Sequence, residues 1–296
     1  MKKVFKGTII LLVIIGVGLT IIANWFFPYL VIGTVHKNCI GETPADFNVE
    51  YERITLKTKE GFLLKGFYTK SKLDTVLGGV IILHGHNSCK ESQLPIVKDL
   101  ANLGFETLVY DARAHGESEG EYCTFGFREK DDVSKAIDFL QNEKSIQNVA
   151  IWGTSYGGAV GLQALEYDER LKCGVIYCTF SDIYDIVADY QEDMFGFGNR
   201  WLSDFVVSRS GEIADFNPLE VRPSNSAKNI EQPVLVAHSK DDEKIDVAYG
   251  KLNFENLQSP EKRLIILEGV GHNNIYGNSG DKLKKQTFDF LKKYLR

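Results

Sequence analysis

The sequence predicts an α/β fold in which a mostly parallel sheet is flanked by helices. Short apolar runs alternate with segments of helical periodicity, a pattern typical of a parallel sheet wrapped by helices. The apolar runs lie at 80–83, 107–110, 149–152, 174–177, 234–237 and 264–267. The helical segments lie near 91–103, 129–143, 155–166, 246–257 and 281–295. Because open sheets of this kind bind ligands at the carboxyl ends of their strands, the residues after each run are the candidates for chemistry.

Length and charge limit the classes of function. The chain has 296 residues, of which 44% are hydrophobic, enough for a sizeable core in one large or two small domains. Its formal net charge is −6, and its lysines are scattered, so it lacks the basic surface of a nucleic-acid-binding protein. We therefore expect no nucleic acid partner, and the sequence leaves the oligomeric state open.

The N-terminal region predicts a membrane segment. Residues 8–32 are apolar except for breaks at Asn24 and Pro28. At about 1.5 Å per residue, a helix of this length crosses a hydrocarbon core of about 30 Å. It exceeds the roughly 7 to 15 residues of a signal-peptide apolar region, and no A-x-A cleavage site follows it. We expect residues 1–34 to be an uncleaved single-pass anchor, with a cleaved signal peptide as the alternative.

The two ends of this segment predict its orientation. Lysines, which favour the cytoplasmic side, precede it at Lys2, Lys3 and Lys6. A belt of aromatic side chains typical of a membrane interface follows at Trp25, Phe26, Phe27 and Tyr29. We expect a cell-membrane protein with its N-terminus inside and the rest of the chain on the outer side.

A single domain follows the membrane segment. Residues 35–50 read as a polar linker with Gly41 and Pro44, and the domain occupies 51–296. It begins with two runs rich in β-branched or aromatic residues, 51–57 and 62–68, separated by a short turn. These runs predict a β-hairpin.

The cysteines carry no pattern of zinc or redox chemistry. They are odd in number, widely spaced and without a C-x-x-C pair, at Cys39, Cys89, Cys123, Cys173 and Cys178. Cys173 and Cys178 lie on opposite faces of one predicted strand, so we expect no bond between them. The five are expected to be ordinary small core residues.

The segment after the run 149–152 carries the first chemical motif. It reads Gly153-Thr154-Ser155-Tyr156-Gly157, and a helical segment follows. This is a G-x-S-x-G pattern between a strand and a helix, where small residues permit the strained turn that exposes a nucleophilic serine. Ser155 is the candidate nucleophile, and the backbone amide of Tyr156 is a candidate oxyanion donor. The structural alternative is a glycine-rich turn capped by serine.

A serine nucleophile needs a histidine base and an acid, expected later in the chain in the order acid, then histidine. The run 234–237 is followed by His238, Asp241 and Asp242, and the run 264–267 is followed by His272. An imidazole there can take the serine proton, while a carboxylate fixes its tautomer. Position within the chain predicts His272 as the base.

The run 80–83 is followed by His84-Gly85-His86-Asn87. The glycine lets the backbone turn, so the amide of His86 is the second candidate oxyanion donor. A metal site through His84 and His86 is the competing interpretation, but the residues that follow supply no further ligands. We expect no metal and no cofactor, and the structural alternative for His84 is a hydrogen bond to loop backbone.

The run 107–110 is followed by a loop of alternating charges, 111–118. We expect Asp111 and Arg113 to tie this loop down by charge-assisted hydrogen bonds, not to act in catalysis.

Taken together, these strand-end motifs resemble the α/β-hydrolase superfamily, in the branch of serine aminopeptidases and monoglyceride or lysophospholipid lipases. The resemblance spans roughly residues 50–296 and is closest to membrane-anchored bacterial hydrolases. It implies a mostly parallel eight-stranded sheet, a small helical lid and the catalytic triad Ser155, Asp242 and His272. In that family the acid lies four positions after the strand-end histidine, which selects Asp242 over Asp241. The sequence departs from the family where Ser239 and Ala114 replace common glycines and Asp246 stands at a common proline.

The lid is expected in the insertion at about 181–230. Its apolar residues are as often packing as pocket lining: Tyr184, Tyr190, Met194, Phe195, Phe197, Trp201, Leu202, Phe205 and Val206. Its acidic residues read as a solvated face or as a site for a cationic substrate group: Asp182, Asp185, Asp189, Glu192 and Asp193.

These features predict acyl transfer to water through an acyl-Ser155 intermediate, with a small-molecule or lipid-like carboxylic ester or thioester as substrate. An amidase or aminopeptidase would use the same triad and is the alternative. A catalytically silent, membrane-tethered binding scaffold is the alternative of another class. Dehalogenases and epoxide hydrolases are excluded because they need an aspartate at position 155.

Overall fold

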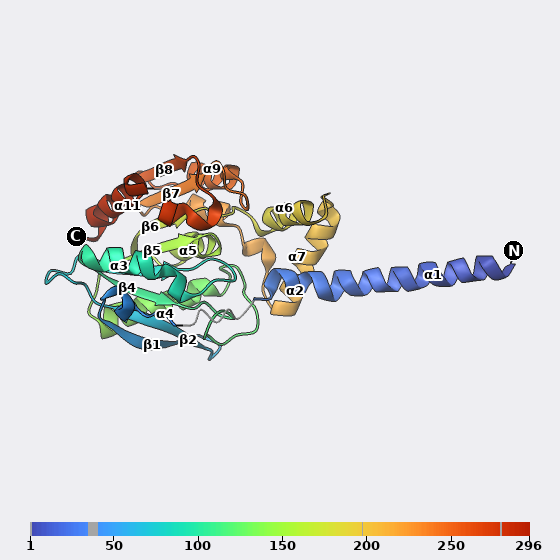
Figure 1. The fold of residues 1–296 in the computed structure, drawn as a ribbon, viewed down its shortest axis with the longest axis horizontal. Helices are drawn as coiled ribbons and strands as arrows, with labels where there is room; N and C mark the ends of the chain where they lie inside the picture. Colours follow the sequence, from blue (N-terminus) through green and yellow to red (C-terminus); the bar gives the residue numbers. More distant parts are fainter. Residues whose placement is uncertain (1, 35–40, 197, 279) are drawn as a thin grey trace.

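The computed structural model describes residues 2–34, 41–196, 198–278 and 280–296 (Figure 1). A domain of helices around one sheet occupies the chain from residue 41 onward, and a long N-terminal helix projects from one end of it.

Eight strands form one sheet in the order β1-β2-β4-β3-β5-β6-β7-β8. β2 is antiparallel to both β1 and β4, and every other pair is parallel. The predicted eight-stranded, mostly parallel sheet is therefore confirmed. The strands are β1 (Tyr51–Lys57), β2 (Leu63–Thr69), β3 (Gly78–Leu83), β4 (Phe105–Tyr110), β5 (Val149–Thr154), β6 (Leu171–Tyr177), β7 (Val234–Ser239) and β8 (Lys262–Leu267).

Helices cover both faces of this sheet. Side chains alternate between the faces of a strand, so Ile81 packs with the core under α4, α5 and α9, while Ile82 packs with the core under α3 and α11. The helices are α3 (Leu94–Asn102), α4 (Glu129–Asp138), α5 (Tyr156–Tyr167), α9 (Val247–Asn256), α10 (Ile275–Asn278) and α11 (Gly280–Leu295). A π-helical turn, Phe139–Glu143, continues α4.

The insertion between β6 and β7 forms a separate layer over the carboxyl ends of the strands. It contains α6 (Ile183–Phe195), α7 (Arg200–Ala214) and the short helices Pro218–Glu220, α8 (Pro223–Ser226) and Ala227–Asn229. α6 begins where the Asp182 carboxylate accepts a hydrogen bond from the Tyr184 amide at 2.8 Å. We refer to residues 181–230 as the lid.

The projecting helix consists of α1 (Lys2–Ile21), a π-helical turn at Ile22–Phe26 and α2 (Phe27–Ile32). The turn lies directly before Pro28, which has no backbone N–H to continue the α-helical ladder. Residues Lys6–Ile32 are long and apolar enough to cross a membrane, a property that an anchor and a signal sequence share.

Part of the predicted polar linker, residues 35–50, has regular structure of its own. Residues 35–40 lie outside the described residues, but Pro44–Phe47 forms a 3₁₀ helix that begins with a capping box between Thr43 and Asp46. Val49 is buried in the core. Pro44 is buried as well, and Phe47 packs against the same core as Val49. Residues 41–50 therefore pack on the domain, because a local cap and these apolar side chains order them.

Candidate functional site

Ser155 occupies the sharp turn between β5 and α5. Its backbone has φ 57° and ψ −122°, a conformation that L-residues rarely adopt. Its amide donates to the Tyr177 carbonyl of β6 at 2.8 Å, and its carbonyl accepts from the Thr179 hydroxyl at 2.8 Å. Neighbouring structure thus holds the serine in a strained conformation at the N-terminus of a helix.

Two glycines make this turn possible through close backbone approach. A Cβ at Gly153 would lie 2.1 Å from the Gly157 carbonyl oxygen, and one at Gly157 would lie 2.5 Å from the Leu83 carbonyl oxygen. Both distances are far below a normal contact, so neither position accepts a side chain without movement of backbone. The G-x-S-x-G spacing therefore reflects a steric requirement of the fold.

The loop after β3 passes next to this turn. A Cβ built on Gly85 would lie 3.6 Å from the Cβ of Ser155. The ring of His84 bonds backbone through both nitrogens, with Nδ1 2.8 Å from the Gly85 carbonyl and Nε2 accepting from the Ala112 amide at 3.0 Å. His84 is therefore a structural residue, and the interpretation of His84 and His86 as a metal pair does not fit.

His86 brings a side chain to the site as well as a backbone amide. Its ring stacks on Phe125, with centroids 5.7 Å apart, and burial lowers the pKa of the imidazole to about 4. The Nε2 atom is buried and has no hydrogen-bond partner among the described residues. The imidazole is thus neutral at physiological pH. The sequence motif pointed only to its amide.

Tyr156 is the first residue of α5, so its backbone amide has no acceptor within the helix. Its hydroxyl donates to the buried Glu129 carboxylate at 3.0 Å. The same carboxylate accepts from the amides of Thr124 and Gly126, each at 2.7 Å. Glu129 thereby links Tyr156 to the loop that carries Phe125, a role that sequence reasoning missed because its partners lie in separate segments.

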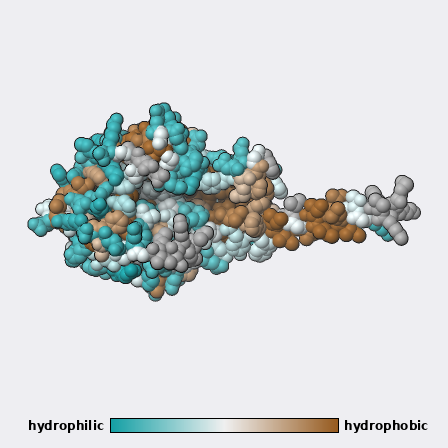
Figure 2. All heavy atoms as spheres, in the orientation of Figure 1, coloured by the Kyte–Doolittle hydropathy of each residue, from teal (hydrophilic) through white to brown (hydrophobic). Residues whose placement is uncertain are grey.

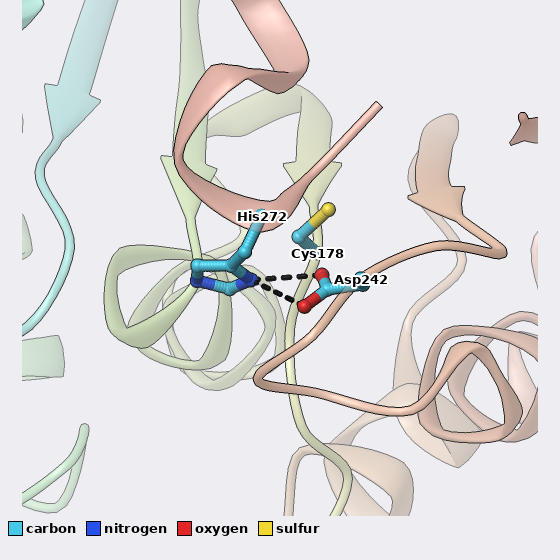
Figure 3. Close-up of side chains that lie close together, drawn as sticks. All are labelled: Cys178, Asp242 and His272. Carbon is cyan, nitrogen blue, oxygen red and sulfur yellow. Dashed lines mark hydrogen bonds and ion pairs between the residues drawn. The ribbon is translucent and has the colours of Figure 1, made fainter. Parts of the chain in front are cut away.

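His272 and Asp242 form a hydrogen-bonded pair (Figure 3). His272 Nδ1 lies 2.9 and 2.8 Å from the two carboxylate oxygens of Asp242, and both side chains are almost fully buried. Because an ionised carboxylate only accepts, Nδ1 carries a proton, and Nε2 is the ring nitrogen that remains to exchange a proton with a substrate or nucleophile. The His272 amide donates to Glu243 at 2.9 Å, which fixes the backbone beneath the ring.

The surroundings of Asp242 keep it ionised. Burial alone would raise the pKa of this carboxyl, but hydrogen bonds from His238 and His272 outweigh it and hold the pKa well below the usual range. The amides of Lys244 and Ile245 also donate to Oδ1, each at 2.9 Å.

The adjacent carboxylate, Asp241, points elsewhere and accepts from the Gly269 amide at 2.6 Å. The structure therefore places Asp242, and not Asp241, against the imidazole.

The three departures from the family pattern each have a local explanation. Ala114 has φ 62°, a left-handed conformation that favours the glycine common there. Asp246 has φ −55°, which a proline would also adopt, and its carboxylate caps α9 by accepting from the Ala248 amide at 2.7 Å. The Ser239 hydroxyl accepts from the Asp241 amide at 3.2 Å.

The end of β6 and the residue that follows it approach both Ser155 and the Asp242–His272 pair. Tyr177 binds the Ser155 amide, and the next residue, Cys178, has its Sγ within 4.8 Å of donor atoms of both Asp242 and His272. Three such groups could hold a metal ion. Burial raises the pKa of the Cys178 thiol, and the imidazole and carboxylate already satisfy one another. The donor set is thus explained without an ion.

The loop after β4 is structural, as predicted. Asp111 accepts from the amide and the ammonium group of Lys90, each at 2.8 Å, and from the Glu117 amide at 3.0 Å. Arg113 binds Asp132 through two parallel hydrogen bonds of 2.9 and 2.8 Å. These buried ion pairs brace the floor of the site.

The cysteines follow the prediction with one exception. Cys123, Cys173 and Cys178 are buried and free, so the expectation of no bond between Cys173 and Cys178 is confirmed. Cys89 is disulfide-bonded, which corrects the description of it as a free core residue. Spacing could not reveal this bond because it depends on proximity in space. Cys39 lies outside the described residues.

A cavity of about 530 Å³ opens above Ser155. Its inner end is formed by the candidate oxyanion residues His86 and Tyr156 and by the buried side chains of Phe180 and Ile245. Most of its other lining is apolar and comes from the lid and from α2. Its volume lies in the range of small-molecule sites.

The lid residues divide between lining and packing. Five of the apolar residues singled out from the sequence line the cavity: Tyr190, Met194, Phe195, Leu202 and Val206. Tyr184, Trp201 and Phe205 are not among its lining, and Phe197 lies outside the described residues.

The lid carboxylates mostly have structural partners. Asp182 pairs with Arg222 at 2.9 Å, Asp185 pairs with Arg200 at 2.6 Å, and Asp189 accepts from the Tyr249 hydroxyl. Glu192 is exposed, and Asp193 lines the cavity. These contacts account for most of the acidic cluster without a substrate.

Comparison with known proteins gives matches over most of the chain. Residues 79–228, about half of it, match a family model described as "alpha/beta hydrolase fold". YqkD of Bacillus subtilis (strain 168) is 28% identical over 255 residues, covering 82% of this chain and 80% of that protein. Protein bem46 of Schizosaccharomyces pombe is 26% identical over 257 residues, covering 84% and 79%.

Solved structures share the fold. An esterase of Pyrococcus furiosus is 21% identical with a TM-score of 0.75, covering 90% of this chain and 99% of that chain. Est1E of Butyrivibrio proteoclasticus, solved with ferulic acid bound, is 15% identical with a TM-score of 0.65, covering 82% and 99%.

Proposed function

The chain belongs to the alpha/beta hydrolase fold family, and from this premise we propose that it is a serine hydrolase that cleaves carboxylic esters or thioesters. The observation that carries the proposal is Ser155, strained at a helix N-terminus on the inner end of an apolar cavity. The buried Asp242–His272 pair supports it, since an imidazole with a free Nε2 is the base that a serine nucleophile needs.

The proposed reaction proceeds through an acyl-enzyme. Ser155 Oγ attacks the acyl carbon while His272 Nε2 takes the hydroxyl proton, and the Asp242 carboxylate stabilises the imidazolium. His272 then gives that proton to the departing alcohol or thiol. Water, activated by the same imidazole, releases the carboxylic acid and restores Ser155.

The amides of His86 and Tyr156 are the proposed oxyanion donors. Both residues line the cavity beside Ser155, and the dipole of α5 adds positive potential at the same point. One donor of this kind contributes about 10²–10³-fold to kcat. The mechanism calls for no metal or organic cofactor, and the prediction of none stays a prediction.

Ester specificity is favoured by the lining of the cavity. Apolar side chains dominate it, which suits an acyl chain. The amidase or aminopeptidase alternative has one specific observation in its favour, namely Asp193 in the lining, which could hold a cationic amine.

The proposed location is the cell membrane, with the hydrolase domain outside. Residues Lys6–Ile32 have the length and apolarity of a span, and Trp25, Phe26 and Tyr29 are exposed at its domain end, as in an interfacial belt. The disulfide at Cys89 fits an oxidising compartment.

Labelling with a fluorophosphonate probe tests the proposal directly. We expect the full-length protein, in detergent, to be labelled at Ser155, and Ser155→Ala to be unlabelled while keeping its circular dichroism spectrum. Turnover of p-nitrophenyl esters should fall at least about 10⁴-fold in Ser155→Ala.

The outcomes separate the alternatives. A panel of p-nitrophenyl esters and aminoacyl anilides would distinguish an esterase from a peptidase. Equal labelling of both proteins would refute Ser155 as nucleophile. A folded wild-type protein that neither labels nor turns over any member of the panel would favour the silent scaffold.

A further inference from the structure

The end of the projecting helix forms part of the cavity wall. Phe27, Leu30 and Val31 of α2 line the same cavity as Ser155. A tether would need no contact with the site, so the contribution of three side chains from this helix requires an explanation.

Contacts on two sides hold α2 in this position. On the lid side, Phe27 packs against Phe195 with ring centroids 5.8 Å apart. The Ser210 hydroxyl of α7, which has the Val206 carbonyl as its nearer acceptor at 2.8 Å, also lies 3.3 Å from the Pro28 carbonyl. On the domain side, the Cys123 amide donates to the Ile32 carbonyl at 3.1 Å, and Ile32 is fully buried. The helix end is thus built into the domain.

The exposed part of the cavity lining marks its mouth. Leu30 on α2 is 49% exposed, and Met194 and Phe195 on α6 are 62% and 43% exposed. In contrast, Tyr156 and Phe180 at the inner end are each 3% exposed. The cavity therefore opens between α2 and the end of α6, where large apolar side chains lie beside the exposed side chain of Asp193.

This opening lies close to the predicted membrane surface. Trp25, in the aromatic belt, precedes Val31 by six positions, about 9 Å along a helix. Arg209 of α7 lies over the Trp25 ring at 5.4 Å, so the lid reaches the belt as well. Figure 1 shows the α6–α7 corner at the end of the domain from which α1 projects, and Figure 2 shows hydrophobic atoms along this helix and at its junction with the domain.

From this arrangement we propose that α2 is a substrate-binding element, and that the substrate is a membrane lipid whose ester-linked acyl chain enters the cavity sideways from the bilayer, between α2 and α6. This inference rests on the proposed serine hydrolase function and names its substrate class. Leu30, Met194 and Phe195 then form the entrance, while Ser155 meets the ester at the inner end.

The physical reason is the cost of moving an acyl chain through water. Each CH₂ group lowers the partition coefficient of the chain from an apolar phase into water roughly fourfold. A long acyl chain therefore does not leave the bilayer unaided. A mouth that adjoins the membrane and carries large apolar side chains on both sides, Leu30 on one and Met194 and Phe195 on the other, offers the chain an apolar path into the cavity. An anchor of this kind limits the substrates to those in the same membrane.

Two esters that share a leaving group but differ in acyl chain length test the inference. The full-length protein is placed in lipid nanodiscs and assayed with 4-methylumbelliferyl palmitate, which resides in the bilayer, and with 4-methylumbelliferyl butyrate. Leu30→Trp and Met194→Trp narrow the mouth from its two sides. We expect each to lower the palmitate-to-butyrate ratio of kcat/KM at least about tenfold. Leu11→Trp is the matched control, because Leu11 is 57% exposed on α1 and is not in the cavity lining, and its ratio should stay within about twofold of wild type.

Fluorophosphonate labelling of each variant separates the two proposals. Ratios that match wild type in both mouth variants, with Ser155 still labelled, would overturn the role of α2 and leave the serine hydrolase standing. Hydrolysis of butyrate without any hydrolysis of palmitate by the wild type would overturn the substrate class. No labelling of the folded wild type would refute the proposed function itself.

Discussion

The carboxyl edge of the sheet and the α2–lid wall are built in different ways. The edge brings Ser155 to the cavity, while Asp242 and His272 belong to the edge but are not among the residues that line the cavity. At the edge, polar groups bind one another at fixed distances. For example, the Asp242 carboxylate accepts hydrogen bonds from the His272 ring and from the backbone amides of Lys244 and Ile245. Across the cavity, the wall consists of apolar side chains such as Leu30 and Met194 that are half exposed.

This difference suits the two regions to different tasks, the reaction at the edge and the choice of substrate at the wall. Directed hydrogen bonds fix atoms to within tenths of an ångström, which proton transfer requires. Apolar contacts are non-directional, so a wall of such residues accepts chains of varied shape and fixes only their polarity. We therefore expect mutations at the edge to change rate, stability or pH dependence sharply, and mutations in the wall to change which substrate is used.

The largest expected effect comes from two neighbouring carboxylates at the edge. Asp242→Asn should lower kcat about 10³–10⁴-fold, because an amide can donate to Nδ1 and favours the wrong tautomer of His272. Asp241→Asn should lower kcat less than about tenfold, since Asp241 binds the Gly269 amide and not the imidazole. Ester turnover by the two purified variants measures this, and the reverse ranking would reassign the acid.

A second comparison sets packing at the edge against packing in the wall. Gly157→Ala should destabilise the protein by about 1–3 kcal/mol, because its Cβ would lie 2.5 Å from the Leu83 carbonyl. Met194→Ala should change stability by less than about 0.5 kcal/mol, because Met194 is largely exposed.

Urea unfolding of both proteins at pH 7 provides the test of this comparison. Gly161→Ala, also on α5, is the control, since its Cβ would lie 3.0 Å from the movable end of the Ile176 side chain and at ordinary contact distance, 3.9 Å, from Ile151, with no backbone atom in the way. An equal loss of unfolding free energy in Gly157→Ala and Gly161→Ala would contradict the steric requirement for glycine at position 157.

The smallest expected effect is on how the free energy of unfolding varies with pH. A carboxylate at the edge, Asp242, and one in the lid, Asp189, should change it in opposite directions. Hydrogen bonds depress the pKa of Asp242 despite its burial, so its contribution is present above the unfolded value of about 3.9 and is lost as pH falls below it. Burial raises the pKa of Asp189 in the lid, so its ionised form costs stability at neutral pH, and that cost disappears as pH falls.

Unfolding free energies measured from pH 7 to pH 3 test these signs. Relative to wild type, Asp242→Asn should show a shallower loss of stability toward acid. Asp189→Asn should show a slightly steeper one. The same slope in both variants would contradict the assigned pKa directions.

Much of the site was predictable because its residues follow strands. G-x-S-x-G after β5, the acidic pair after β7 and His272 after β8 are local patterns, and a parallel sheet brings its carboxyl ends to one edge. The long apolar N-terminal helix and the α/β fold class also follow from hydrophobic patterns along the chain.

Other features were not predictable because their partners are remote in sequence. Glu129 joins α4 to Tyr156, the disulfide at Cys89 depends on a contact in space, and the 3₁₀ helix Pro44–Phe47 replaces part of a supposed linker. The choice of Asp242 over Asp241 rested on the family resemblance alone, and side-chain direction gives it a physical reason, since Asp242 binds His272 and Asp241 binds the Gly269 amide.

The sequence by itself determined the order of strands and helices, the apolar N-terminal segment, and the chemical groups available at the strand ends. These depend on periodicity and on residues a few positions apart. Only the tertiary structure decided that α2 lines the cavity of Ser155, because residues more than a hundred positions apart meet there. Packing between α2 and the lid, and not any local motif, brings the apolar N-terminal helix to the candidate active site.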